Sequence, residues 1–295
     1  MESIPDAIRQ CSGNVRQLWQ RANPCTLCPR KCKVNRGRGQ VGYCGIDIIP
    51  KVSSIGPHFG EESVLVGSGG SGTIFFAGCN LACVFCQNYD ISHQRQGREM
   101  SFEQLAQSML DLQNYGCSNI NFVTPTHVIH AIAAAIELAI EKGLKIPTVY
   151  NSGGYDSVEI LKLLEGLIDI YMPDMKYADA KTAGELSDAP DYPQINFAAV
   201  KEMHRQVGDL KTEKGLAVRG LLVRHLVLPE NLAGSEKIID FLAKEIIPKT
   251  TINIMSQYRP CYHASTYPKI NRRPTHEEIS ATKQYAIKKG LQILD

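Results

Sequence analysis

Three cysteines, Cys79, Cys83 and Cys86, stand on a short segment with the spacing C-x3-C-x2-C. They follow an apolar run at 73–77 and Gly78, so we expect them on a loop at the carboxyl end of a strand. Three thiolates so placed can hold three corners of a cubane iron–sulfur cluster, which takes four ligands when it is closed. The fourth iron would then be open to a chelating small molecule, as in metal sites that do chemistry.

Two other interpretations stay open for this trio of thiols. They could form a zinc site completed by His93 or Cys117, or they could be three unrelated buried thiols. The preceding strand, Gly78 before the first cysteine and Phe85 before the last favour the cluster. Cys117 is then expected to be a core thiol.

A second set of cysteines, Cys25, Cys28, Cys32 and Cys44, has the spacing C-x2-C-x3-C-x11-C. This spacing suits a closed four-thiolate site that holds zinc or a second iron–sulfur cluster. The chain between them has no acidic residue and five basic ones: Arg30, Lys31, Lys33, Arg36 and Arg38. These cations would offset the charge of the thiolates, which is the plainer account, or dock an acidic partner. A redox-active C-x-x-C pair and a nucleic-acid-binding zinc ribbon are weaker alternatives.

The first cysteine loop resembles the signature of the radical S-adenosylmethionine (SAM) enzymes. The segments that follow it resemble most the branch that contains pyruvate formate-lyase activating enzyme, and the resemblance covers about residues 71–260. It implies that Cys79, Cys83 and Cys86 bind a [4Fe-4S] cluster and that the backbone near Phe85 meets the adenine of SAM. The ferredoxin-like insertion that some relatives carry after this loop is not visible.

Polar residues follow the next predicted strand, 119–124, as Thr124-Pro125-Thr126-His127. The family usually has a Gly-Gly-Glu-like element here for the amino group of SAM, and this sequence departs from that pattern. Thr124 and Thr126 are the expected replacements, because hydroxyl and carbonyl oxygens can accept from an ammonium. An ordinary threonine cap on the following helix is an equal alternative.

Two further strand ends carry groups suited to SAM. Asn151 and Ser152 can bond a ribose or a carboxylate, although a simple turn is the favoured interpretation of that segment. Asp174 and Lys176 resemble the family's Asp-x-Lys element, whose members contact the nucleoside and the methionyl carboxylate. Their alternative is an ion pair with each other.

Arg224 stands inside an otherwise apolar run at 220–228, where an unpaired charge is rare. The run resembles the family's Arg-x-x-x-x-Pro-Gly strand, with Glu230 in place of the glycine. A clamp on the SAM carboxylate and a structural ion pair are the two interpretations.

The elements that must position these groups alternate from residue 71 onward. Apolar runs predict strands at 73–77, 119–124, 146–151, 167–172, 220–228, 251–255 and 291–294. Periodicity and caps predict helices at about 102–115, 127–142, from 156, 195–208, 235–246 and 275–289. The expected fold is α/β, a partial (β/α)6 TIM-like barrel at 71–295 preceded by a small Cys-rich metal-binding module at 1–70.

Composition narrows the function classes. The 295 residues are 43% hydrophobic and carry a net charge of +2, so nucleic acid is not expected as a partner. A signal peptide and a membrane span are not expected, and ten cysteines in such a chain favour metal chemistry in a reducing cytoplasm.

The resemblance implies a radical SAM oxidoreductase of the activating-enzyme type. A reducing protein of the flavodoxin or ferredoxin type would donate the electron, and the substrate would be a glycine Cα in a partner protein. The alternatives are a non-catalytic iron–sulfur or zinc-binding redox or regulatory protein, and a zinc enzyme or zinc-bearing RNA-binding protein.

Overall fold

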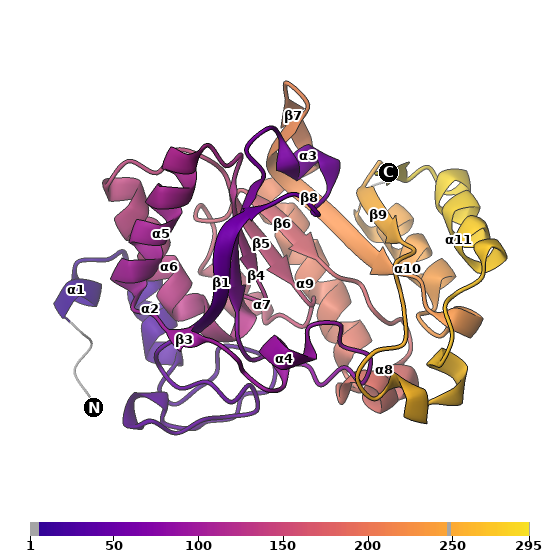
Figure 1. Ribbon diagram of the computed structural model, residues 1–295, viewed down its shortest axis with the longest axis horizontal. Coiled ribbons are helices and arrows are strands. Elements are labelled where there is room, and N and C mark those ends of the chain that lie inside the picture. Colours follow the sequence, from indigo (N-terminus) through magenta and orange to yellow (C-terminus); the bar gives the residue numbers. More distant parts are fainter. Residues whose placement is uncertain (1–5, 247–248, 295) are drawn as a thin grey trace.

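A largely parallel sheet organises residues 6–246 and 249–294, the part of the chain that the computed structural model describes (Figure 1). Across those residues the sheet has ten strands in the order β10-β9-β8-β6-β5-β4-β2-β1-β3, with β7 paired to β8. The parallel strands are β2 (Ser71–Phe76), β4 (Ile120–Val123), β5 (Thr148–Ser152), β6 (Ile170–Pro173), β8 (Leu216–Leu226), β9 (Thr251–Met255) and β10 (Gln292–Ile293). Their carboxyl ends meet at one edge, which is where the expected site residues stand.

Three strands are antiparallel additions to this sheet. The first, β1 (Lys51–His58), pairs with β2, and β3 (Arg98–Glu99) pairs with β1. The third, β7 (Lys211–Glu213), forms a hairpin with the start of β8. The predicted boundary after residue 70 therefore falls between two paired strands.

Helices follow the parallel strands. The longer ones are α5 (Phe102–Tyr115), α6 (Ile129–Glu141), α9 (Tyr192–Val207) and α11 (His276–Lys288); the shorter ones are α1 (Asp6–Arg9), α2 (Gly13–Arg21), α3 (Ser63–Val66), α4 (Tyr89–Ser92), α7 (Val158–Lys162), α8 (Ala180–Ser187) and α10 (Ser235–Phe241), with a π turn at Leu242–Ile246. The predicted capping box at Ser101 and Gln104 is present, and Gly116 ends α5 with φ +101°. The α/β partial-barrel prediction is confirmed.

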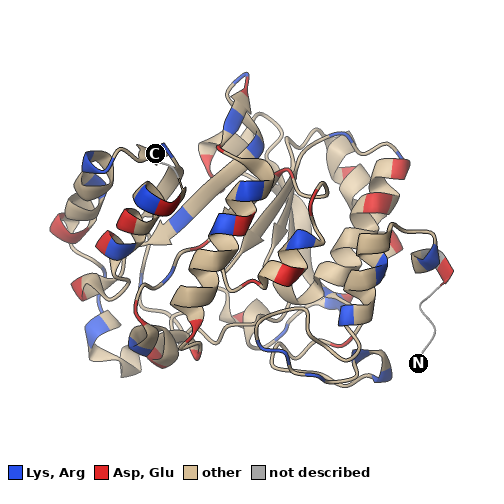
Figure 2. Cartoon of the chain, turned by 180° about the vertical axis from the view of Figure 1, so that it is seen from behind, with Lys and Arg blue, Asp and Glu red and all other residues tan. Residues whose placement is uncertain are grey.

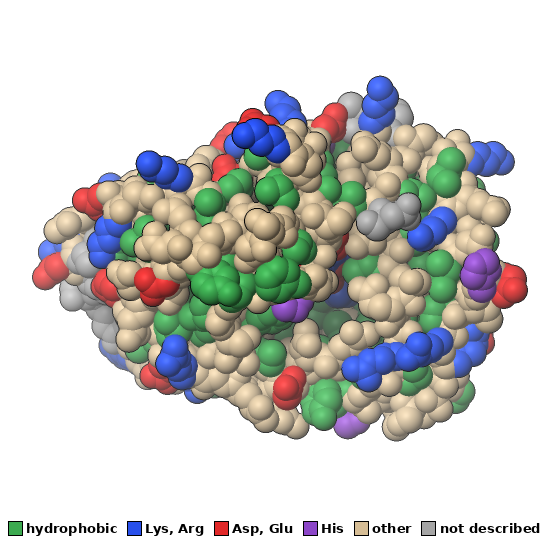
Figure 3. Space-filling view, turned by 45° about the horizontal axis from the view of Figure 1, so that its top comes forward, with side chains coloured by type: hydrophobic (Ala, Val, Ile, Leu, Met, Phe, Trp, Pro, Cys, Tyr) green, Lys and Arg blue, Asp and Glu red, His purple; other side chains and the backbone are tan. Residues whose placement is uncertain are grey.

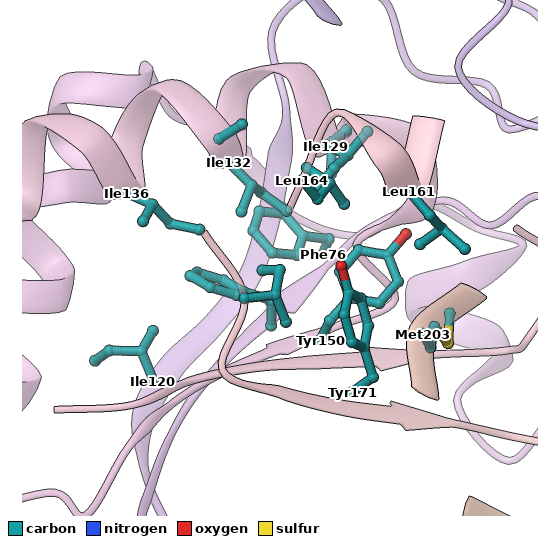
Figure 4. Close-up of a cluster of buried hydrophobic side chains, with 14 of the residues drawn as sticks. Phe76, Ile120, Ile129, Ile132, Ile136, Tyr150, Leu161, Leu164, Tyr171 and Met203 are labelled. Atoms are coloured by element: carbon teal, nitrogen blue, oxygen red, sulfur yellow. The ribbon is translucent and has the colours of Figure 1, made fainter. Parts of the chain in front are cut away.

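The two faces of the sheet carry separate apolar clusters. Because side chains alternate along the strands, Ile120, Tyr150 and Tyr171 point toward the helices and pack with α6 and its neighbours (Figure 4). On the opposite face, Leu65 of α3 joins a smaller cluster whose other members are Val149, Ile170, Met172, Ala217 and Leu222. The segment between β1 and β2 thus covers part of the inner face of the sheet.

The amino-terminal segment is tied to the barrel at several points. Trp19 of α2 lies with its ring centroid 5.0 Å from that of His130 on α6, and Ile8, Val15 and Leu18 belong to the main core cluster. None of the helices in the described part of the chain is both long enough and apolar enough to cross a bilayer.

Candidate active site

The cysteine loop begins directly after β2 and is anchored by backbone contacts from far along the chain. The amide of Ala82 donates to Ser187 O at 3.2 Å, and that of Val84 donates to Leu186 O at 2.9 Å. Gly78 has φ +82°, and a Cβ there would lie 2.7 Å from the carbonyl oxygen of Cys44, so only glycine fits the turn. The loop shape is therefore fixed by its surroundings.

All three thiols of this loop are free and close enough to influence one another electrostatically. Burial, reinforced by Cys83 and Cys86, raises the pKa of Cys79 to about 12. Burial also raises the pKa of Cys83. Lys176 and the hydroxyl of Ser187, which donates to Cys83 Sγ at 2.9 Å, oppose this rise because they stabilise the thiolate. A cationic cluster would complete this charge balance, so the donor set suits an iron–sulfur cluster held by three thiolates.

A compact charged network lies beside this loop. Arg224 Nε donates to Asp174 Oδ1 at 3.0 Å, and its Nη2 donates to Asn151 Oδ1 at 2.7 Å. Lys176 Nζ donates to Asp174 Oδ2 at 2.6 Å. Burial alone would raise the pKa of Asp174, but the two cations hold it below its usual value. The structure thus brings together four of the predicted residues, from β5, β6 and β8.

Thr124, Thr126 and Ser152, which were also predicted, lie at the same strand ends, and two of them bond to Asp156. Thr126 Oγ1 donates to Asp156 at 2.7 Å and Ser152 Oγ donates to it at 2.6 Å, while Tyr150 adds a third hydroxyl at 2.8 Å. Burial raises the pKa of Asp156, opposed by these donors. Thr124 adopts a left-handed conformation, φ +62°. Sequence reasoning missed Asp156, which joins the ends of β4 and β5.

Phe85 is buried among aromatic rings rather than exposed on the loop. Its ring lies edge-on to Tyr258 and Tyr177, with centroids 5.6 and 6.5 Å apart. Tyr258 follows β9, so the first and last βα loops of the barrel meet here. This cluster offers an apolar wall beside the cysteine loop.

An open cavity of about 890 Å³ extends from Arg224, past Asn253, to the segment that precedes α3 (Figure 3). Figure 3 shows a hollow with charged side chains at its floor. Glu61 and Glu62 line it, and burial raises the pKa of Glu61, an effect that Arg224 opposes. These carboxylates were not predicted, because nothing in the local sequence indicates that residues 61 and 62 face a strand end more than 160 residues later.

The second cysteine set also converges. Cys25, Cys28, Cys32 and Cys44 line one small cavity with Arg36, Tyr43 and His127. In the described part of the chain, no group of three or more His, Cys, Asp or Glu side chains is placed to hold a single metal ion. Cys117 is 3% exposed in the main core, as expected for a core thiol.

Two proteins of known sequence are similar to this chain over most of its length. Over 279 residues the chain is 35% identical to the uncharacterized protein MJ0674 of Methanocaldococcus jannaschii, which covers 92% of this chain and 76% of that protein. It is 25% identical over 295 residues to the uncharacterized protein MJ0808 of the same organism, with coverages of 91% and 79%.

Solved structures share the fold. Streptococcus suis SuiB bound to precursor peptide SuiA has a TM-score of 0.50 at 15% identity, covering 73% of this chain and 46% of SuiB. HydG, a maturase of the [FeFe]-hydrogenase, has a TM-score of 0.51 at 14% identity, covering 75% and 50%. The match spans about half of each of these chains. Residues 73–242 match the Radical SAM superfamily, and the chain therefore belongs to that family of enzymes.

Proposed function

We propose that the enzyme holds a [4Fe-4S] cluster through Cys79, Cys83 and Cys86 and uses it to cleave SAM reductively. The observation that carries this proposal is the convergence of three thiols, one buried ammonium and one guanidinium at the carboxyl edge of the sheet. When bound, the cluster supplies the electron that splits SAM into methionine and a 5'-deoxyadenosyl radical, which abstracts hydrogen from a substrate.

The charged network suits the polar groups of SAM. Arg224 and Lys176 supply cations for the methionyl carboxylate of SAM. Asp174 and Asn151 supply oxygens that can accept from the ammonium of SAM or from its ribose hydroxyls. The wall around Phe85 suits the adenine ring.

We propose that Thr124, Thr126 and Ser152 help to bind the amino group of SAM. The hydroxyls of Thr126 and Ser152 donate to Asp156, and each keeps a lone pair with which to accept from an ammonium. Thr124 would contribute its carbonyl from its left-handed conformation directly after β4.

The test is conversion of SAM to 5'-deoxyadenosine by anaerobically reconstituted protein with dithionite. Cys83→Ala should reduce the rate at least 100-fold, because it removes a cluster ligand. Cys117→Ala is the matched control, since it removes a buried thiol at the opposite edge of the sheet and should stay within twofold of the parent. Equal turnover in both variants would refute the assignment of the cluster to these three cysteines. No turnover in the parent with an intact cluster would refute the proposed activity and favour a non-catalytic iron–sulfur protein.

For the substrate, we propose that the enzyme activates a glycyl radical enzyme by abstracting hydrogen from a glycine Cα. The electrons would come from a flavodoxin or ferredoxin. This proposal is supported by the likeness of the cysteine loop and the Asp174-x-Lys176 element to activating enzymes. A candidate partner deuterated at glycine should transfer deuterium into 5'-deoxyadenosine. Deuterium transfer to 5'-deoxyadenosine from a small molecule, and not from the partner protein, would exclude this assignment.

We also infer that Cys25, Cys28, Cys32 and Cys44 hold a metal centre, either zinc or a second cluster. Four thiols that line one cavity support this inference.

A further inference from the structure

The amino-terminal cysteine cavity contains a buried charge without a counter-ion. Arg36 is 1% exposed and lines the cavity with the four thiols. Its Nη1 donates to the carbonyl of His127 at 2.7 Å, but Nε and Nη2 have no hydrogen-bond partner among the described residues. A guanidinium stays protonated in proteins, so a buried one without a partner requires an anion beside it. Four thiolates around a metal centre supply that negative charge.

The backbone around Cys32 is arranged for sulfur ligation. The amide of Tyr43 donates to Cys32 Sγ at 3.3 Å, which stabilises a thiolate. Lys31 and Lys33, on either side, have φ values of 43° and 57°, and a Cβ on Gly42 would lie 2.8 Å from the same sulfur. Backbone strain of this kind persists where surrounding structure and function require it.

The place of the four thiols favours a cluster over a zinc ion. Four cysteines that line one cavity can close either a zinc site or an iron–sulfur cluster. Zinc has no redox chemistry, whereas a cluster beside the SAM cysteine loop can exchange an electron with it.

The cavity and the SAM cysteine loop share a wall. The carbonyl of Cys44 lies against Gly78, the residue before Cys79. His127, which lines the cavity, bonds through Nε2 to the carbonyl of Ala77 at 2.8 Å. Arg30 adds a further link, donating to Asn80 O at 2.9 Å and stacking 3.8 Å from the ring centroid of Tyr43. Contiguous covalent and hydrogen-bonded contacts therefore join the two sites.

We propose that Cys25, Cys28, Cys32 and Cys44 hold a second iron–sulfur cluster that receives one electron from an acidic, low-potential donor protein and passes one electron to the cluster at the SAM site. No bond forms or breaks at the second cluster. The amino-terminal loops carry several basic residues, whose positions are blue in Figure 2, and this charge suits the docking of an acidic donor. The relay rests on the proposed function, whereas the identity of the second centre does not.

Metal content tests the identity of the centre. The triple variant Cys79→Ala, Cys83→Ala, Cys86→Ala should keep about four irons with matching sulfide, and its reduced electron paramagnetic resonance (EPR) signal should not change when SAM is added. The parent should contain about eight irons, and Cys28→Ala with Cys44→Ala about four, with a signal that SAM does change. Stoichiometric zinc, or an iron-free triple variant that is folded by circular dichroism, would overturn the inference.

The choice of reductant tests the relay. With dithionite, the Cys28→Ala, Cys44→Ala variant should cleave SAM within about threefold of the parent, because a small reductant reaches the SAM cluster directly. With reduced flavodoxin it should be at least tenfold slower than the parent, while Cys11→Ala is unaffected. Equal slowing with both reductants would overturn the relay. A parent with eight irons and no SAM cleavage would refute the proposed function and leave the second cluster in place.

Discussion

Replacement of Asp174 by Asn should destabilise the fold, because it removes the carboxylate that pairs with both Arg224 and Lys176. Arg224 and Lys176 would then face each other without the carboxylate that both contact, at 2.9 and 2.6 Å. Removing one partner of a buried pair costs about 3–5 kcal/mol. The three side chains are 12–18% exposed, so we take the lower end, about 3 kcal/mol.

Thermal unfolding followed by circular dichroism at pH 7 measures this effect. For a chain of this size about 3 kcal/mol corresponds to a fall in Tm of roughly 6–12 °C. The matched control is Glu245→Gln, which breaks an ion pair with Lys201 of similar length, 2.7 Å, between side chains that are about half exposed. This control should change the stability by less than about 1 kcal/mol.

The pH dependence follows from the depressed pKa of Asp174. Its contribution to stability is present above the unfolded pKa of about 3.9 and is lost as the pH falls through the lower, folded value. The difference between the parent and Asp174→Asn should therefore shrink in acid. If Asp174→Asn and Glu245→Gln proved equally stable at pH 7, the carboxylate would not hold the network together and this reasoning would fail.

Two further changes test the backbone around the site and the distal helix. Gly154→Ala should lower the free energy of unfolding by about 2 kcal/mol or more, because φ is +75° and a Cβ would clash with Asp174 O. Gly116→Ala, with φ +101°, ψ 18° and open space around the Cβ, should cost about 1 kcal/mol in the same urea titration. Thr275→Ala should cost about 1 kcal/mol in that titration by removing the capping box with Glu278, and an unchanged urea midpoint would contradict it.

Sequence reasoning succeeded where the determinants are local. The helix at 102–115 is announced by Ser101, Gln104 and Gly116, and the structure reproduces its bounds. The seven strands predicted from apolar runs are all present, with ends shifted by a few residues. The strand at 51–58 was missed because it contains Gly56 and Pro57 and is held by pairing with β2, which no local pattern reveals.

The residues of the candidate site could likewise be predicted only where the determinants are local. Both cysteine sets could be predicted from the sequence, because their members stand close together along the chain. The carboxylates of Asp156, Glu61 and Glu62 could not be foreseen, since each meets its neighbours only when distant segments come together. Thr126 and Ser152 were predicted by their place after strands, yet their shared partner Asp156 was not.

The bonds from Ala82 and Val84 to residues 186–187 bear on when the enzyme can acquire its metal. Those two amides find their acceptors only after the chain has been synthesised well beyond α8, and His263 adds a later contact to Val84 O. A growing chain on the ribosome would present the three thiols on an unshaped segment. A cluster bound by the proposed ligands would thus be acquired after translation, once the barrel has closed around the loop.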